Sequence, residues 1–319
     1  MSGEASMPLV ARRVERIAQD IHLIELVRPD ARPLPEFTAG AHVAVRTPNG
    51  LQRKYSLCNA PEANDHYAIA VKREAGGRGG SMSLIDATKA GDTLEVSAPR
   101  NDFALKGNPA SYLFIAGGIG ITPIWSMIQH LRNSGGKPFR LYYLSRAPEA
   151  TAFLDALSAP SFRGSVTIHH DYGDPERSLD LWDVLEKPRG AHVYCCGPRP
   201  LMEAVRDMTG HWSTAAVHFE DFGAGDVAHA ANDRPFDVRL DRTGGVVHVP
   251  ADKTILETLR AHGLMLPSSC ESGTCGTCRT GLVAGEPDHR DLVLSDAEHQ
   301  REIMICVSRA KSPELTLDL

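Results

Sequence analysis

Four cysteines near the end of the chain constrain its fold more than any other feature. Cys270, Cys275 and Cys278 have the spacing C-x4-C-x2-C, and Cys306 follows much later. Thiolate sulfur is a soft ligand that suits an iron–sulfur cluster or zinc. Structural zinc sites usually take their cysteines in two closely spaced pairs, whereas the last cysteine here stands alone. The sequence therefore predicts a [2Fe–2S] cluster on these four residues, with zinc as the alternative.

Composition limits the remaining possibilities. A chain of 319 residues is long enough for two or three domains at roughly 100–200 residues each. The net charge of −6, without a basic run, argues against nucleic acid as a partner. No segment resembles a signal peptide, and none approaches the roughly 18 apolar residues of a membrane span. Seven cysteines in such a chain favour a reducing compartment, so we expect a soluble cytoplasmic protein without a membrane partner.

The first hundred residues have the pattern of β-strands. Apolar residues alternate with polar or small ones in three stretches, and turn residues separate the stretches. The apolar positions are Ala41, Val43 and Val45, then Tyr67, Ile69 and Val71, then Leu94, Val96 and Ala98. This pattern predicts a small antiparallel barrel or sandwich.

Two pieces of this region suit an anion such as phosphate. Arg53 stands in the stretch 53–57 after a turn, and a glycine-rich turn at 76–80 precedes a short apolar run. A glycine turn that leads into a helix presents free N–H groups, and Ser81 can cap that helix or bond a phosphate. Arg53 adds a bidentate donor. A solvated loop and a solvated strand end are the alternatives.

The middle of the chain contains a second nucleotide-binding pattern. The apolar strand Tyr112–Ala116 leads into Gly117-Gly118-Ile119-Gly120-Ile121-Thr122-Pro123, and helical spacing follows. We expect Thr122 as the helix N-cap and Pro123 as its first residue. Strand, glycine turn and helix N-terminus together suit a dinucleotide pyrophosphate, although Pro123 replaces the third glycine of G-x-G-x-x-G.

Further strands at 139–145, 166–170 and 193–195, with helices around 150–157 and 179–186, predict a parallel sheet. Asp171 ends one strand, where it can orient cofactor hydroxyls or amides. Neighbouring His169 and His170 point to opposite faces and cannot readily share one metal ion. Arg146 follows the second strand, where an arginine can accommodate a 2′-phosphate.

The last third begins with a small, polar stretch at 225–235 that is typical of a linker. Alternating apolar residues then predict a hairpin, and Thr254–Ala261 has helical spacing. The cysteine loop, a strand at 303–307 around Cys306 and a last strand at 315–317 follow.

Four motifs in this order resemble the phthalate dioxygenase reductase and vanillate O-demethylase reductase family, within the ferredoxin-NAD(P) reductase superfamily. They are R-x-Y-S with G-G-S, G-G-x-G-x-T-P, C-G-P and the cysteine motif. The resemblance implies a multidomain chain. Its expected parts are an antiparallel β-barrel FMN domain at 1–107, an α/β parallel-sheet NAD(P)H domain at 108–224, a linker at 225–235, and an α+β β-grasp ferredoxin domain at 236–319.

The resemblance also assigns roles to residues. Arg53, with Gly79, Gly80 and Ser81, would hold the FMN phosphate, and Tyr55 would lie against the isoalloxazine. Ser56 would lie near flavin N5 and Cys196 near the nicotinamide C4, which makes them the catalytic candidates. Leu57, Val71, Lys72 and Phe222, the last on the flavin face, complete the expected FMN site. The expected NAD site consists of Gly118, Gly120, Thr122, Pro123, Ser145, Arg146, Asp171, Cys196, Gly197 and Pro198.

These cofactors address one chemical problem, because a nicotinamide donates a hydride whereas a [2Fe–2S] cluster accepts single electrons, and a flavin can do both. The resemblance implies electron flow from NADH through FMN and the cluster to a Rieske-type terminal oxygenase, a transient protein partner of a monomeric reductase. Alternatives are another acceptor (a di-iron hydroxylase, a haem protein or a quinone), a flavin reductase that releases reduced FMN, and a zinc-bearing binding module without turnover. Arg146 leaves NADPH open as the donor.

Overall fold

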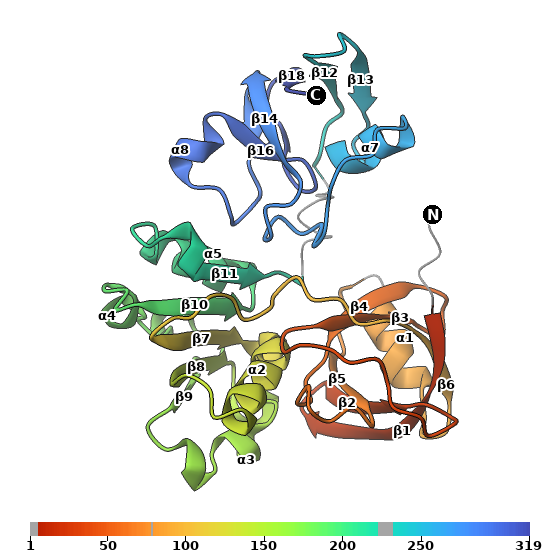
Figure 1. Cartoon of the computed structure of the whole chain (residues 1–319), viewed down its shortest axis with the longest axis vertical. Helices are drawn as coiled ribbons and strands as arrows, with labels where there is room; N and C mark the ends of the chain where they lie inside the picture. The colour runs from red at the N-terminus through yellow and green to blue at the C-terminus, as the bar shows by residue number, and fades with distance from the viewer. Residues whose placement is uncertain (1–5, 78, 223–231) are drawn as a thin grey trace. The chain divides into compact units, whose positions relative to one another are not determined.

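The N-terminal strands form an antiparallel sheet that closes into a barrel (Figure 1). The structure is a computed structural model that describes residues 6–77, 79–222 and 232–319. The sheet order is β4-β3-β6-β1-β2-β5, and the bridge between Leu57 and Ile69 joins the two edges. The strands are β1 (Ser6–Ala18), β2 (Ile21–Val27), β3 (His42–Arg46), β4 (Gln52–Ser56), β5 (Tyr67–Lys72) and β6 (Thr93–Ser97). The predicted barrel is confirmed, with helix α1 (Gly80–Ala87) after β5.

A parallel sheet follows, as predicted. Its order is β11-β10-β7-β8-β9, and β7 pairs in parallel with both β8 and β10. The strands are β7 (Ser111–Gly117), β8 (Phe139–Ser145), β9 (Val166–His170), β10 (Ala191–Cys196) and β11 (Val217–Glu220). Because the strand order reverses between β7 and β10, the carboxyl ends of these two strands lie at the switch point where such sheets bind ligands.

Several helices of this region differ from expectation. The helices are α2 (Ile121–Asn133), α3 (Leu154–Leu157), α4 (Trp182–Leu185) and α5 (Arg199–Met208), with 3-10 turns η1 (Gly118–Gly120), η2 (Pro148–Ala150), η3 (Pro160–Phe162), η4 (Pro175–Arg177) and η5 (Thr214–Ala216). The helix expected at 150–157 is reduced to α3 because Phe153 has a left-handed φ of 59°. The helix expected at 179–186 begins only at Trp182, whose N–H donates to the Asp180 carboxylate.

The predicted start of α2 is wrong by two residues. The helix continues from the 3-10 turn η1, and its N-cap is Gly120. Thr122 lies inside the first turn, where its hydroxyl donates to the carbonyl of Ile119 instead of capping the helix.

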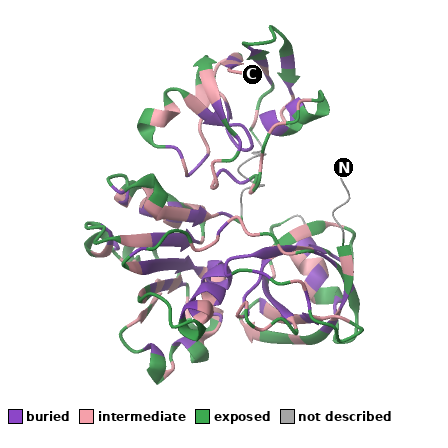
Figure 2. Cartoon of the chain, viewed as in Figure 1, coloured by how far each residue is buried: buried purple, intermediate pink, exposed green. Residues whose placement is uncertain are grey.

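Helix α2 packs the sheet against the barrel. Ser126 donates to the Asn59 carbonyl at 2.8 Å, and Gln129 donates to the Cys58 carbonyl at 2.8 Å. Most of α2 and β7 is buried (Figure 2). One hydrophobic core therefore includes barrel residues and sheet residues, and residues Met1–Gly197 form one compact unit.

The second unit, Pro198–Leu319, contains a β-grasp sheet of order β13-β12-β18-β14-β16. Its elements after α5 and β11 are β12 (Phe236–Leu240), β13 (Val246–Val249), α7 (Ile255–Ala261), β14 (Arg279–Ala284), β15 (Pro287–Asp288), α8 (Asp296–His299), β16 (Glu302–Met304), β17 (Arg309–Ala310) and β18 (Glu314–Leu317). The β12 strand pairs in antiparallel fashion with β13 and in parallel with β18. The predicted ferredoxin fold is confirmed.

The strand predicted at 303–307 is wrong in its second half. Strand β16 ends at Met304, and the N–H of Ser308 donates to the Met304 carbonyl at 3.0 Å. This bond closes a turn, and Cys306 therefore lies in the turn and not in a strand.

The predicted domain borders stay predictions. Most of the expected linker, 225–235, lies outside the described residues. Within the ranges that the structure describes, no helix combines the length and the apolar character needed to cross a membrane.

Candidate functional site

Arg53 and the start of α1 meet at one place in the barrel unit. A Cβ atom on Gly80 would lie 2.9 Å from both Cγ and Nε of Arg53, so the arginine side chain lies directly against this backbone. Gly79 is the N-cap, with a left-handed φ of 81°, and no side chain of the described residues caps the helix. A guanidinium beside the N–H groups of a helix start is suited to a phosphate.

The turn between β3 and β4 holds this helix start in place. Asn49 donates through its backbone N–H to the Ser83 hydroxyl at 2.9 Å and through Nδ2 to the Gly79 carbonyl at 3.3 Å. The alternative that Ser81 caps α1 is wrong, because Ser81 is the second helical residue and its hydroxyl accepts from the Glu74 N–H. The role of Ser81 toward a phosphate stays a prediction.

The neighbouring strands supply the rest of the expected flavin site. The hydroxyl of Tyr55 is buried without a hydrogen-bond partner among the described residues, and burial raises the pKa of Tyr55 to about 12. Buried polar atoms are normally paired, so this hydroxyl fits a site completed by a bound group. Ser56, Leu57 and Val71 are buried, whereas Lys72 is exposed at the end of β5.

The glycine loop after β7 touches the end of β10. A Cβ atom on Gly120 would lie 2.1 Å from the carbonyl oxygen of Cys196, so only glycine fits there. Gly118 has a φ of 52°, and Thr122 and Pro123 follow in the first turn of α2. The geometry joins the two sequence motifs at the switch point of the sheet. The Cys196 side chain is buried.

The ends of β8 and β9 form the other part of the expected nucleotide site. The Asp171 N–H donates to the Ser145 carbonyl at 3.3 Å, and its carboxylate accepts from the Gly173 N–H at 2.8 Å. Arg146 is exposed, whereas the Ser145 hydroxyl is buried and bonds Thr151 at 2.6 Å.

The two histidines of β9 contact different partners. His169 Nε2 lies 2.6 Å from the carbonyl oxygen of Arg177, and His170 Nε2 lies 3.0 Å from the Thr151 hydroxyl.

Phe222, expected on the flavin face, is 47% exposed and is therefore not a core residue of its unit. The preceding Asp221 is buried and accepts from Arg199 at 3.3 Å. Arg199 is the first residue of α5, directly after Gly197 and Pro198.

The four cysteines of the motif converge in the second unit. Cys270 and Cys275 share a hydrogen bond, and so do Cys278 and Cys306. The bond from Cys275 is the main cause that lowers the pKa of Cys270 to about 4, while the pKa of Cys275 is raised. The Ser272 N–H also donates to Cys270 sulfur at 3.3 Å. Four convergent sulfurs with N–H donors around them fit a cluster held by thiolates.

A glycine allows the cysteine loop to approach the turn that carries Cys306. Gly273 has a φ of 72°, and a Cβ atom there would lie 2.7 Å from Val307 and 3.1 Å from Cα of Asp291. The Leu292 N–H donates to the Gly273 carbonyl at 3.0 Å. The loop is thus held against segments that lie 18 to 34 positions after Gly273.

One group of possible metal ligands was not predicted from the sequence. His289, Asp291 and His299 lie together beside α8, and their ligand atoms all lie within 4.8 Å of one another. The only signal in the sequence was the His-x-Asp pair, because His299 joins it through the fold.

Two family models match the chain. Residues 8–105 match the oxidoreductase FAD-binding domain, and residues 238–311 match the 2Fe-2S iron-sulfur cluster binding domain. The phthalate dioxygenase reductase of Burkholderia cepacia is 55% identical over 306 residues, which cover 96% of this chain and 95% of that protein. The chain belongs to the phthalate dioxygenase reductase family.

Other reductases are also similar to this chain over nearly its whole length. The phthalate 4,5-dioxygenase oxygenase reductase subunit of Pseudomonas putida is 54% identical, covering 99% of this chain and 97% of that protein. A vanillate O-demethylase oxidoreductase from a Pseudomonas strain is 42% identical over 95% of this chain and 96% of that protein.

Two solved structures are similar to this chain over nearly its whole length. The structure of a phthalate dioxygenase reductase, described as modular for electron transfer from pyridine nucleotides to [2Fe-2S], has a TM-score of 0.71 and 53% identity, with 99% and 98% of the two chains covered. An intact type IV self-sufficient cytochrome P450 monooxygenase has a TM-score of 0.70 and 37% identity; the match covers 98% of this chain and 41% of that one.

This reductase is therefore an iron–sulfur flavoprotein oxidoreductase, and the predicted cofactors FMN, [2Fe–2S] and NADH are confirmed. It transfers electrons from NADH through the flavin to the cluster. The match to the 2Fe-2S iron-sulfur cluster binding domain favours the predicted iron–sulfur cluster over the zinc alternative. When bound, the flavin supplies the conversion of the electron pair of one hydride into two single-electron transfers.

Proposed function

We propose that this chain is the reductase component of a Rieske-type oxygenase system and delivers single electrons to the oxygenase. The observation that carries the proposal is the 54–55% identity, over nearly the whole chain, to two reductases named for phthalate dioxygenases. The reductase works as a monomer that contacts the oxygenase transiently.

In the flavin site, Arg53 and the backbone of Gly79, Gly80 and Ser81 bind the FMN phosphate. The contact between Arg53 and Gly80 supports this assignment, because it places a positive charge at an uncapped helix start. The remaining contacts to FMN come from Tyr55, Ser56, Leu57, Val71, Lys72 and Phe222.

In the nucleotide site, Gly118 and Gly120 let the pyrophosphate approach the start of α2. The contact of Gly120 with Cys196 supports a single site at the two strand ends. Ser56 and Cys196 are the proposed catalytic residues, and each orients one of the two reacting rings. Further contacts to the nucleotide come from Thr122, Pro123, Ser145, Arg146, Asp171, Gly197 and Pro198.

In the cluster site, Cys270 and Cys275 would hold one iron, and Cys278 and Cys306 would hold the other. The pairing of the four sulfurs by hydrogen bonds supports this division. Cys278 and Cys306 are each 3% exposed, whereas Cys270 and Cys275 are less buried. Cys270 and Cys275 would therefore hold the cluster on its more solvent-accessible side.

Reconstitution tests the function. The purified reductase, NADH, phthalate and the oxygenase component of the Burkholderia cepacia phthalate system are combined, and oxygen uptake and hydroxylated product are measured. Product should form only when reductase and oxygenase are both present. Failure of this oxygenase and of a vanillate O-demethylase oxygenase to accept electrons would reject the proposal.

Cys275→Ser separates the two halves of the pathway. NADH should still bleach the flavin absorbance, whereas cytochrome c reduction and oxygenase turnover should fall to a few per cent or less, because the cluster loses a ligand. Cys58→Ala, which changes a buried cysteine outside the cluster, is the control and should keep electron delivery. Undiminished cytochrome c reduction in Cys275→Ser would instead support a reductase that releases reduced FMN.

A haem acceptor is the second candidate function. The 37% identity to a self-sufficient cytochrome P450 monooxygenase over 98% of this chain favours it. Anaerobic reduction of an isolated P450 haem domain by the reductase and NADH tests this candidate. A rate well above that with the Rieske-type oxygenase would reverse the ranking.

A further inference from the structure

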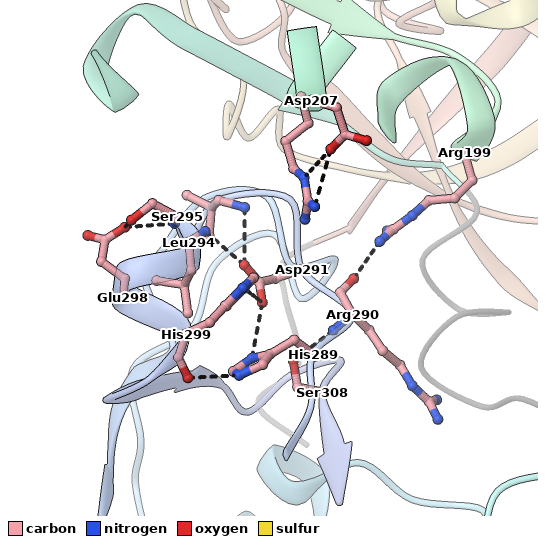
Figure 3. Close-up of polar contacts among 12 residues, drawn as sticks. Arg199, Asp207, His289, Arg290, Asp291, Leu294, Ser295, Glu298, His299 and Ser308 are labelled. Atoms are coloured by element: carbon pink, nitrogen blue, oxygen red, sulfur yellow. Dashed lines mark hydrogen bonds and ion pairs between the residues drawn. The ribbon is translucent and has the colours of Figure 1, made fainter. Parts of the chain in front are cut away.

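Three side chains of the second unit bring metal-binding atoms together outside the cysteine cluster. His289 follows β15, His299 ends α8, and Asp291 lies in the segment between these elements. Figure 3 shows the carboxylate of Asp291 directed at the two imidazole rings. The Asp291 side chain is fully buried, and the two histidine side chains are 18% and 15% exposed. The three residues are called the His–Asp–His cluster below.

The hydrogen bond of His289 leaves a lone pair inside the cluster. Its Nε2 lies 3.0 Å from the carbonyl oxygen of His299, and a carbonyl can only accept, so Nε2 carries the proton. Burial lowers the pKa of His289, which favours the neutral ring. Its Nδ1 is then an acceptor, buried and without a hydrogen-bond partner among the described residues. It faces Oδ1 of Asp291 at 3.9 Å, which is beyond hydrogen-bond distance.

The backbone holds the carboxylate in this orientation. Oδ2 of Asp291 accepts from the N–H groups of Leu294 at 2.8 Å and Val293 at 3.2 Å. Oδ1 is left toward the rings and lies 3.2 Å from Nε2 of His299. Hydrogen bonds of this kind orient the ligands of metal sites.

We propose that the His–Asp–His cluster is a binding site for a divalent first-row transition-metal ion of the zinc type. Two imidazoles and one carboxylate are a donor set that zinc accepts, with a fourth position for water. At bond lengths of about 2.1 Å, two ligand atoms can lie at most about 4.2 Å apart. The separations of 3.2 and 3.9 Å from Oδ1 already meet this limit.

One local movement completes the site. The two rings are stacked, with centroids 3.9 Å apart and an angle of 24° between their planes. They must turn toward Asp291 so that their in-plane lone pairs point at a common centre.

The test uses the purified holoprotein with FMN and the iron–sulfur cluster in place. After treatment with a mild chelator and desalting, Zn²⁺ is titrated by calorimetry, and zinc, iron and flavin per chain are measured. We expect one zinc per chain without loss of iron, which distinguishes this site from zinc uptake by the cysteines. Zinc should also raise the melting temperature of the wild type, because an ion that binds only the folded state stabilises it.

Matched variants locate the ion. Asp291→Asn and His299→Gln should each weaken zinc binding by at least about 100-fold, because loss of a ligand exceeds the 10–100-fold effect of losing its supporting partner. His248→Asn is the control, since His248 pairs with Asp237 at 2.8 Å on the exposed surface of the same domain. It should bind zinc like the wild type.

Three results would overturn the proposal: no calorimetric binding of Zn²⁺ to the wild type, uptake only with loss of iron, or equal affinity in wild type and both cluster variants. If Asp291→Asn fails to fold, as judged by its iron and flavin content, His299→Gln and His289→Gln decide the question. The failure of oxygenase reconstitution would not bear on this result, because zinc binding is measured without any acceptor.

Discussion

At the scale of single residues, the expected cofactor sites depend on glycines that other side chains or backbones approach closely. Arg53 lies against Gly80, and the Cys196 carbonyl lies against Gly120. At either glycine, any side chain larger than hydrogen would displace the neighbouring group, which is Arg53 at Gly80 and the Cys196 carbonyl at Gly120. Two substitutions test these contacts.

Arg53→Ala should weaken FMN binding by about 10–100-fold, because hydrogen bonds to charged groups contribute roughly 1.5–3 kcal/mol. Titration of the flavin-free protein with FMN, followed by quenching of flavin fluorescence, measures the change. Arg46→Ala, on the adjacent strand β3, is the matched control and should leave the affinity unchanged. If Arg53→Ala and the wild type bind FMN with equal affinity, the assignment of Arg53 to the phosphate site is wrong.

Gly120→Ala should lower the rate of flavin reduction by NADH at least about tenfold, because a Cβ atom 2.1 Å from the Cys196 carbonyl must push the two strand ends apart. A displacement near 1 Å at a reacting site costs up to about 100-fold in rate. Stopped-flow bleaching of the flavin measures the rate. Gly210→Ala meets only an ordinary contact at 3.6 Å and should behave like the wild type. A normal rate in Gly120→Ala would refute the expected closeness of the two loops.

At the scale of elements, helices α7 and α1 differ in how their N-termini are capped. Helix α7 has a complete capping box, in which Thr254 and Glu257 each bond the other's backbone N–H. Helix α1 has glycine at its N-cap, and within the described parts of the chain no side chain caps it. The first pattern satisfies the helix start internally, whereas the second leaves N–H groups for a ligand.

Thr254→Ala should destabilise the ferredoxin domain by about 1 kcal/mol, the usual cost of a lost N-cap. Thermal loss of the cluster absorbance follows this domain, and its midpoint should fall. Thr243→Ala changes an exposed threonine in the turn after β12 and serves as the control. If both variants melt alike, the capping box does not limit the stability of this domain.

At the scale of the whole molecule, buried charges connect distant parts of the chain in the second unit. Arg309 is 2% exposed and donates to the carbonyls of Lys253, Pro250 and Arg234. Asp233 lies 3.4 Å from Arg309 and bonds Arg290 through both carboxylate oxygens. This network ties the start of the domain to its last strands.

Asp233→Asn should destabilise the ferredoxin domain by about 3–5 kcal/mol, because it leaves the buried Arg309 without its carboxylate partner, whereas Arg290 keeps its ion pair with Asp288. Urea titration that follows the cluster absorbance measures the loss. Asp237→Asn breaks an exposed pair with His248 and should cost about 1 kcal/mol or less. A loss in Asp233→Asn no larger than that of the control would show that the Asp233 charge does not stabilise the buried Arg309.

Much of the architecture was predictable from local patterns. Strands β8 (Phe139–Ser145) and β9 (Val166–His170) agree with the prediction residue for residue, because long apolar runs between turn residues mark strands without reference to the rest of the fold. The helix at 150–157 was not predictable, since the left-handed Phe153 is set by its surroundings. The turn at Cys306 was not predicted either. The apolar run 303–307 has the pattern of a strand, and nothing in that pattern marks where the chain turns.

The family and its cofactors were predictable from the amino-acid order, since cysteine spacing, glycine turns and their succession along the chain are local properties. Which residues meet became clear from the folded chain: Arg53 meets Gly80, Gly120 meets Cys196, and His299 meets His289 and Asp291. These contacts were not predictable because the partners are far apart in the sequence. Arg309 and the Arg234 carbonyl are 75 positions apart, and no periodicity in a chain records a contact that arises when sheets and loops close over one another.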